Sequence, residues 1–161
     1  MKFNQAEFIG NQLFIKGNKS PIVVRITLII VLLICLLIPI AITITLMSER
    51  KGPHFGIFLS FIFFWGIGFY MLRIILWNTF GREVLTFEDD KISYEADYRY
   101  FRDGKTSIST KDIEVVAVPT IDESAKLGIL IFTNENQHID TVLRVPFDKM
   151  TELAAEVNNR Y

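Results

Sequence analysis

The sequence contains little of the chemistry that disulfide-rich domains and metalloproteins depend on. Among its 161 residues there is one cysteine, Cys35, and there are two histidines, His54 and His138. A single cysteine excludes an internal disulfide, and two isolated histidines are a poor start for a metal centre, which needs several converging ligands. We therefore expect no disulfide, no bound metal and no cofactor.

Acidic residues are scarce in the first half of the chain. Residues 1–77 carry 2 Asp/Glu and 7 Lys/Arg, whereas residues 78–161 carry 16 and 10, so the net charge of -1 conceals halves of +5 and -6. Half of all residues are nevertheless hydrophobic. This segregation excludes both a disordered chain and a single soluble globule, and it indicates that the two halves have different surroundings.

Two long runs almost free of charge account for the apolar residues. Residues 21–47 contain one charge, Arg25, and residues 55–77 contain one, Arg73. As helices, at about 1.5 Å per residue, the runs measure about 40 and 35 Å, more than the ~30 Å hydrocarbon core of a bilayer. The sequence therefore predicts two transmembrane helices.

A short polar segment, residues 48–54, separates the two runs. Its Gly52–Pro53 pair cannot continue a helix, so we expect a tight two-helix hairpin. The pair Ser20–Pro21 is typical of a helix start, with the Ser hydroxyl accepting from the first turn. A signal peptide is the alternative for the first run, but such peptides use an apolar core of only ~7–15 residues and a cleavage site that is missing here.

Two spans return the chain to the side from which it started, so both termini share one compartment. Near the spans, the Lys and Arg residues on that side are Lys2, Lys16, Lys19, Arg25, Arg73 and Arg82. The turn carries only Arg50 and Lys51. By the positive-inside rule, residues 1–20 are expected to be cytoplasmic and residues 48–54 extracytoplasmic.

The second run also has small and aromatic residues at informative positions. Trp77 and the nearby Phe80 fit an interfacial aromatic belt. Small residues let helices approach closely, and we expect them to pack between the two spans rather than form a dimer motif. These residues are Gly56, Ser60, Gly66 and Gly68.

The remaining residues, 78–161, change to alternating apolar and polar positions, which is typical of strands. The pair Asp103–Gly104 is a strong hairpin signal, because Gly tolerates positive φ and Asp hydrogen-bonds locally. The expected strands lie in residues 83–89, 91–103 (one long strand or a bent pair), 106–110, 113–120, 127–134 and 138–146. The pattern predicts six or seven antiparallel strands.

Helical spacing returns at the end of the chain. Asp148 would lie near the positive end of the helix dipole. One face of the predicted amphipathic helix carries Phe147, Met150, Leu153, Ala154 and Val157. Because a domain of about 84 residues has little core, we expect a strongly bent sheet or half-open barrel closed by this helix.

A short alternating stretch, Gln12–Lys16, precedes the first run. Both this stretch and residues 78–161 would lie on the same side of the membrane. It is expected either to add a strand to the sheet or to form an interfacial segment, and the sequence favours neither.

The layout as a whole resembles known bacterial membrane proteins. Two N-terminal spans lead through the junction Leu76–Gly81 into a hairpin, the segment Lys111–Asp112–Ile113 with Val116, and a closing helix. In this it is similar to the bacterial pleckstrin-homology (PH) and YcxB-like families. The resemblance implies an α+β membrane protein of the bacterial cell (inner) membrane, with residues 78–161 as a cytoplasmic PH-like domain.

Catalytic motifs are absent from the sequence: there is no nucleophile elbow and no phosphate-binding loop. A group of carboxylates invites an acid/base or cation-site interpretation, but a solvated edge that deters aggregation explains it more simply. Its members are Asp89, Asp90, Glu95, Asp97 and Asp103. We therefore expect no enzymatic activity and assign no catalytic residue.

The tail also has a series of aromatic residues, Tyr94, Tyr98, Tyr100 and Phe101. Such rings can stack on bases, but a domain with a charge of -6 repels a phosphate backbone, which excludes nucleic acid as the expected partner. The same sign argues against binding to an anionic lipid surface.

These observations favour a membrane-anchored adaptor, assembly or regulatory protein that binds a protein partner, with a basic partner fitting the acidic tail. An immunity protein that neutralises a toxin at the membrane is the alternative, and a lipid-sensing PH-like module is the third. The partner is expected to contact the hairpin Asp97–Asp103 through Asp97, Tyr98, Tyr100 and Asp103, because repulsion from the membrane, within a Debye length of ~8 Å, keeps an acidic face in solvent.

Overall fold

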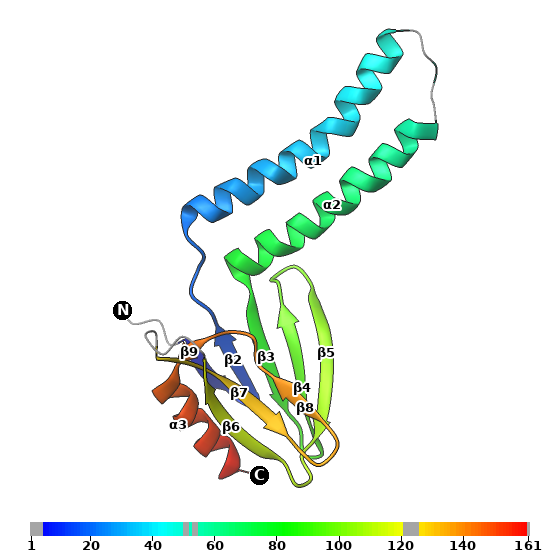
Figure 1. The fold of residues 1–161 in the computed structure, drawn as a ribbon. Helices are drawn as coiled ribbons and strands as arrows, with labels where there is room; N and C mark the ends of the chain where they lie inside the picture. Colours follow the sequence, from blue (N-terminus) through cyan, green and yellow to red (C-terminus); the bar gives the residue numbers. More distant parts are fainter. Residues whose placement is uncertain (1–4, 50–51, 53–54, 121–125, 161) are drawn as a thin grey trace. The chain divides into compact units, whose positions relative to one another are not determined.

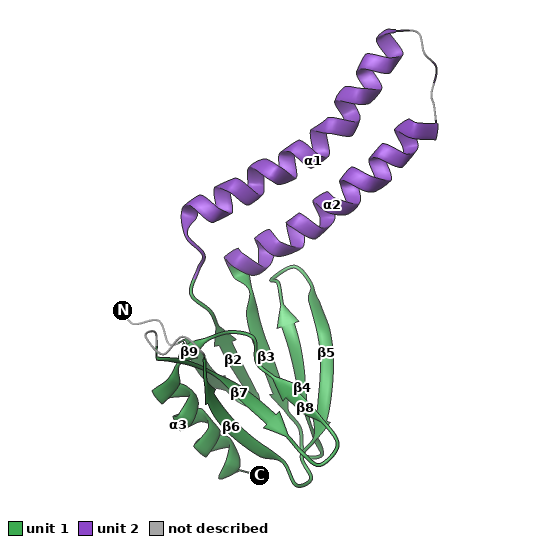
Figure 2. Ribbon diagram, viewed as in Figure 1, with its two compact units in different colours: residues 1–18, 80–161 green, residues 19–79 purple. Residues whose placement is uncertain are grey.

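The computed structural model describes residues 5–49, 52, 55–120 and 126–160. The chain divides into two compact units (Figure 2). One is a helical hairpin, residues 19–79, and the other, here named the β domain, combines residues 1–18 with residues 80–161. The β domain is therefore interrupted in sequence by the helices.

The helical hairpin contains two helices that are long and apolar enough to cross a membrane, α1 (Ile22–Ser48) and α2 (Phe55–Phe80) (Figure 1). The predicted cap of α1 is wrong, because Pro21 precedes the helix and no side chain caps it. The Ser20 hydroxyl instead donates to Oδ1 of Asn78 in the last turns of α2. This bond ties the beginning of α1 to the end of α2.

Close packing between the two helices depends on Gly68. A Cβ at this position would lie 3.6–3.8 Å from side-chain atoms of Leu32, Cys35 and Leu36, so the missing side chain lets α1 approach. A Cβ added at Gly56 or Gly66, in contrast, would meet no atom of α1 or of any other described segment within 4 Å. The expected packing role is therefore confirmed for Gly68 but not for these two glycines.

The first sheet of the β domain is five-stranded and antiparallel, in the order β1-β2-β3-β4-β5 (Figure 1). Its strands are β1 (Ala6–Ile9), β2 (Gln12–Lys16), β3 (Arg82–Phe87), β4 (Lys91–Asp97) and β5 (Arg102–Ser109). β2 precedes the helical hairpin in the sequence and β3 follows it, and the two strands pair, with Leu13 opposite Leu85. The alternative in which Gln12–Lys16 joins the sheet is thus confirmed, whereas β1 was not predicted.

The β4–β5 turn lies earlier in the sequence than expected. The N–H of Tyr98 donates to the carbonyl of Phe101 at 3.0 Å, and Arg99 has a φ of 79°. Gly104 has a φ of 67° but lies inside β5, where the pairing register shifts opposite β4. The predicted turn at Asp103–Gly104 is therefore wrong, because the positive φ that glycine allows forms a bulge instead.

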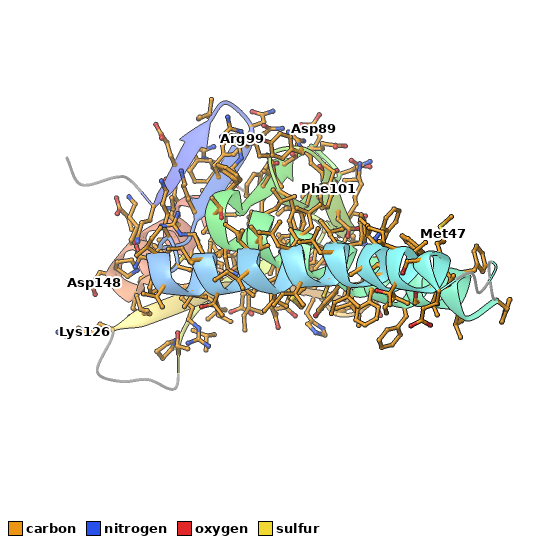
Figure 3. The ribbon with its side chains drawn as sticks, turned by 90° about the horizontal axis from the view of Figure 1, so that it is seen from above. Met47, Asp89, Arg99, Phe101, Lys126 and Asp148 are labelled. Carbon is orange, nitrogen blue, oxygen red and sulfur yellow. The ribbon has the colours of Figure 1, made fainter. Side chains whose placement is uncertain are left out.

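The second sheet contains four strands, with β9 pairing to β7 beside β8. Its strands are β6 (Glu114–Pro119), β7 (Leu127–Thr133), β8 (His138–Asp140) and β9 (Val145–Pro146). Helix α3 (Phe147–Asn158) follows and lies beside β6 (Figure 1). The N–H of Phe147 donates to the carbonyl of Lys126, which brings Lys126 and Asp148 to the same end of the domain (Figure 3).

Both sheets and α3 share one apolar core. The rings of Phe87 and Phe132, one from each sheet, are 6.4 Å apart. On α3 the buried residues are Met150, Leu153, Ala154 and Val157, which confirms four of the five residues of the predicted face, and Phe147 is half-buried. The side-chain amide of Asn158 accepts a hydrogen bond from the N–H of Val115 and donates one to the carbonyl of Val115, which fixes the end of the helix against β6.

The described strands form two separate sheets and do not close into a barrel. The chain leaves the first sheet after β5 through a loop in which Asp112 has a φ of 53°. Beside β8, the side-chain amide of Asn134 donates to the carbonyl of Ser109. The two sheets are therefore joined there by a side-chain hydrogen bond and not by backbone pairing between strands. The described strands thus form two sheets rather than the one strongly bent sheet or half-open barrel that was expected, whereas the α+β class with a C-terminal helix is confirmed.

Candidate functional site

The predicted partner-binding residues lie at the end of the first sheet that is joined to the helices, here named the proximal end. There β2 ends at Lys16, opposite Arg82, where β3 begins. Gly81 alone separates α2 from β3, and residues 17–21 separate β2 from α1. The proximal end is consequently tied to both helices by short connections.

Asp97 is at this end but is buried, with 4% of its surface exposed. Its Oδ2 accepts from Nε of Arg82 at 2.8 Å and lies 2.7 Å from Nη2 of the same side chain, while its Oδ1 accepts from the N–H of Arg99. Burial by itself raises the pKa of Asp97, but the Arg99 N–H and the Arg82 guanidinium together hold that pKa below its ordinary value. Asp97 is thus an ionised residue that fixes the β4–β5 turn.

Tyr98 is also part of the internal structure of the turn. The residue is 7% exposed, and its ring stacks on Phe101, with centroids 4.6 Å apart and planes at 13°. The stack lies across the mouth of the turn, between the two residues that pair by their backbones. Its contribution is therefore to hold the turn in shape.

Arg99, which is labelled in Figure 3, and Tyr100 are both exposed and form the tip of the turn. The Arg99 guanidinium carbon lies 4.8 Å from the ring centroid of Phe80 and 6.0 Å from that of Tyr100. The rings of Phe80 and Tyr100 meet edge to face at 6.3 Å. Since Phe80 is the last residue of α2, these contacts hold the tip at the point where the helix ends.

Asp103 lies in β5, opposite Ala96, and is half-buried. One carboxylate oxygen accepts from the N–H of Gly104 at 2.7 Å, which supports the bulge. The structure thus brings all four predicted residues to one end of the sheet. Asp97 and Tyr98 are engaged in contacts inside the domain, and Tyr100 and Asp103 are the two predicted residues that solvent can reach.

Most exposed carboxylates gather at the opposite end of the β domain, here named the distal end. The β3–β4 turn and the β7–β8 turn meet there, joined through Asn134 and Ser109, which pairs with Lys91. The exposed carboxylates are Glu88, Asp89, Asp90, Asp112, Glu114 and Glu135. The cations beside them are Lys91 and Lys111, so the charge of the domain is polarised along the strands.

One carboxylate, Glu83, is fully buried between the first sheet and the link from β8 to β9. One oxygen accepts from the Tyr94 hydroxyl at 2.8 Å and from the N–H of Val142 at 2.6 Å, and the other accepts from the N–H of Leu143 at 3.2 Å. Burial raises the pKa of Glu83 above its ordinary value of 4.5, against the lowering effect of the three hydrogen bonds. Glu83 ties the link to the sheet from inside.

Sequence reasoning missed two groups at this site. Glu83 alternates with Leu85 and Phe87, so its inward direction follows from the strand period and could have been found. Val142 and Arg144 lie in a segment that was assigned to a strand, and no local pattern shows that Glu83 anchors this segment to the first sheet. Their exposure at the proximal end is visible only in the fold.

In the described part of the chain, no three His, Cys, Asp or Glu side chains lie close enough to hold a metal ion. No family model, curated protein or solved structure matches the sequence or the fold. The structure itself shows two long apolar helices, antiparallel sheets and a C-terminal helix, which together make an α+β fold.

Proposed function

We propose that the chain is an integral membrane protein that acts as a non-enzymatic adaptor or regulatory protein and binds a protein partner through its β domain. The carrying observation is the polarity of that domain, which has short connections to two apolar helices at one end and a group of exposed carboxylates at the other. In this reading the helices cross a bacterial inner membrane and both termini are cytoplasmic.

The surfaces of the helices support membrane insertion. A core helix of a soluble protein is mostly buried, but the buried residues of α1 and α2 are only Cys35, Pro39 and Gly68. Their remaining surface is covered by exposed Ile, Leu, Val and Phe side chains. Contiguous apolar surface of this extent is stable in lipid and not in water.

A PH-like relationship of the β domain belongs to the same proposal. Two antiparallel sheets share a core with one C-terminal helix, which lies beside β6 and places Arg160 4.6 Å from the ring of Phe8 in β1. Scaffolds of this kind present edges and loops to partners, and binding requires no catalytic group.

The distal end is the surface best suited to a basic protein partner. Five of its six exposed carboxylates lie in turns or loops, where side chains are accessible without breaking the sheet, and the sixth, Glu114, is the first residue of β6. The free edge of β5 is less suited to strand addition, since the Gly104 bulge and the charges of Arg102 and Lys105 interrupt it.

Topology can be tested with single cysteines in full-length chains that carry Cys35→Ala. Gly52→Cys is expected to react with an impermeant maleimide in intact cells, because the turn is extracytoplasmic. Asn136→Cys, at an exposed position of the β7–β8 turn, should react only after the cells are opened. Labelling of Asn136→Cys but not Gly52→Cys in intact cells would reverse the proposed orientation.

Partner binding can be tested by charge reversal at the two ends of the domain. In membranes cross-linked before detergent extraction, Asp89→Lys with Asp90→Lys is expected to reduce recovery of the bound protein by about tenfold, with a loss of salt dependence. The matched variant Asp103→Lys, at the proximal end, should leave recovery nearly unchanged. If Asp103→Lys abolishes recovery and the distal pair of substitutions does not, the partner binds at the β4–β5 hairpin. If recovery changes neither with the three substitutions nor with salt, the proposal is contradicted.

A further inference from the structure

We propose that the proximal end of the β domain rests on the headgroup region of the bilayer that holds α1 and α2, through Tyr100, Phe101 and Val142 with Arg99 and Arg144. The inference rests on the proposed membrane anchoring and adds a second, peripheral contact with lipid. Its chemistry is that of an anionic membrane surface: amphipathic rings for the interface and guanidinium groups for lipid phosphates.

Chain connections limit how far this end can lie from the helix ends. Phe80 belongs to α2, and Gly81 is the one residue between it and β3. On the other side, residues 17–21 span at most about 18 Å when fully extended. If α1 and α2 span the bilayer, the proximal end therefore lies beside the interface.

The tip of the β4–β5 turn is positioned more closely still. Phe80 contacts Tyr100 edge to face, and the Arg99 guanidinium lies over the Phe80 ring. All three belong to the β domain, so the contacts do not depend on how the two units are oriented. The tip thus follows the last residue of α2.

Apolar exposure is concentrated at this end. Among its described residues the β domain has five exposed large apolar side chains, and three of them are proximal: Tyr100 at 72%, Val142 at 64% and Phe101 at 38%. Val142 is placed here because its N–H donates a hydrogen bond to the Glu83 carboxylate. The next residue, Leu143, packs on Gly17 beside the end of β2. Aromatic residues beside cations are the usual composition of a protein surface that meets lipid headgroups.

The charges at the two ends favour the same orientation. Arg99 and Arg144 make no ion pair with any described residue. Of the proximal carboxylates, Asp97 is already paired with Arg82, and Asp103 accepts from the N–H of Gly104. The distal carboxylates lie a strand length away, about 17 Å for five residue steps, which exceeds the ~8 Å Debye length at physiological salt. The net acidity of the domain therefore does not prevent its basic end from contacting an anionic surface.

The test uses the full-length Cys35→Ala chain in phosphatidylcholine vesicles with or without about 30% phosphatidylglycerol. An environment-sensitive fluorophore is attached at Tyr100→Cys or Val142→Cys. The matched control is Ile9→Cys, a side chain that is 60% exposed at the distal end of β1. Brominated lipids should quench the two proximal labels and not the distal label.

Charge reversal supplies a second measurement. In vesicles that contain phosphatidylglycerol, Arg99→Glu with Arg144→Glu is expected to reduce quenching of the Val142→Cys label by about fivefold or more, and Arg99→Lys with Arg144→Lys should retain it. Equal circular dichroism of the variants serves as the folding control.

Two outcomes separate this inference from the proposed anchoring. Trp65 and Trp77 both lie in α2, and their quenching by brominated lipids reports insertion of the helix. If the tryptophans are quenched but the proximal labels behave like the Ile9→Cys label, the headgroup contact is wrong and anchoring stands. If the tryptophans are not quenched, both the anchoring and the headgroup contact are wrong. In that case, protection of the proximal labels that varies with the protein-to-lipid ratio would assign this surface to a second copy of the chain.

Discussion

Replacing Glu83 by alanine is expected to lower the free energy of unfolding of the β domain by about 3–5 kcal/mol, because three donors lose their acceptor and a cavity forms. Those donors are the N–H groups of Val142 and Leu143 and the Tyr94 hydroxyl. Tyr94→Phe is the matched control, since it removes one of the three bonds, and should cost about 1 kcal/mol. Hydrogen exchange of strand amides in the detergent-solubilised full-length chain measures both.

The pH dependence of this contribution has a definite sign. Burial raises the folded-state pKa of Glu83, so the fold favours the neutral carboxyl. The stabilisation is fully present below the ordinary pKa of 4.5 and is lost as the pH rises through the folded-state value. The stability of wild type minus that of Glu83→Gln should therefore be greatest in acid and shrink as the pH rises. A difference that grows with pH would mean that the hydrogen bonds to the carboxylate outweigh its burial.

Leu13→Asp is expected to unfold the β domain at a cost of more than about 4 kcal/mol, because it places an unpaired charge at a fully buried position. Asn11→Asp, which adds the same charge in the exposed β1–β2 turn, should cost less than about 0.5 kcal/mol. Protease cleavage within residues 82–160 of the full-length chain provides the measurement, and the helices should stay intact in detergent.

The expected loss follows from the position of β2 inside the sheet. Leu13 lies opposite Leu85 in β3, and both side chains are completely buried. If residues 12–16 were only an interfacial segment, the substitution would leave residues 82–160 protected. Such protection would therefore exclude β2 from the sheet.

Patterns that are complete within one segment were predicted well. The lengths of the apolar runs gave both helices, and the period of Met150, Leu153 and Val157 gave the buried face of α3. The N-terminal stretch Gln12–Lys16 alternates visibly, but its partner β3 follows about 65 residues later, beyond what a local pattern can specify. The interpretation of that stretch accordingly remained open until the pairing was known.

The misplaced turn and the burial of Asp97 have a common physical origin. A glycine with positive φ serves either a turn or a bulge, and only the cross-strand register, with Ala96 opposite Asp103, decides between them. Likewise, Asp97 counts as a negative charge in the sequence, although the register sets it against Arg82, fifteen residues earlier. Charge totals average over both ends of a domain, so the basic proximal and acidic distal ends were not separated.

The interruption of the β domain by the helices also sets an order of assembly. β1 and β2 leave the ribosome first, and at about 5–20 residues per second the helical hairpin of about 60 residues delays β3 by roughly 3–12 s. During that interval the β1–β2 pair is an isolated hairpin, which is marginally stable in water. In the proposed topology β2 can meet β3 only when both helices have crossed the bilayer and returned to one side. Completion of the sheet thus depends on correct insertion, because a chain with one misinserted helix cannot pair β2 with β3. Such a chain is left with exposed strand edges that quality-control proteases can recognise.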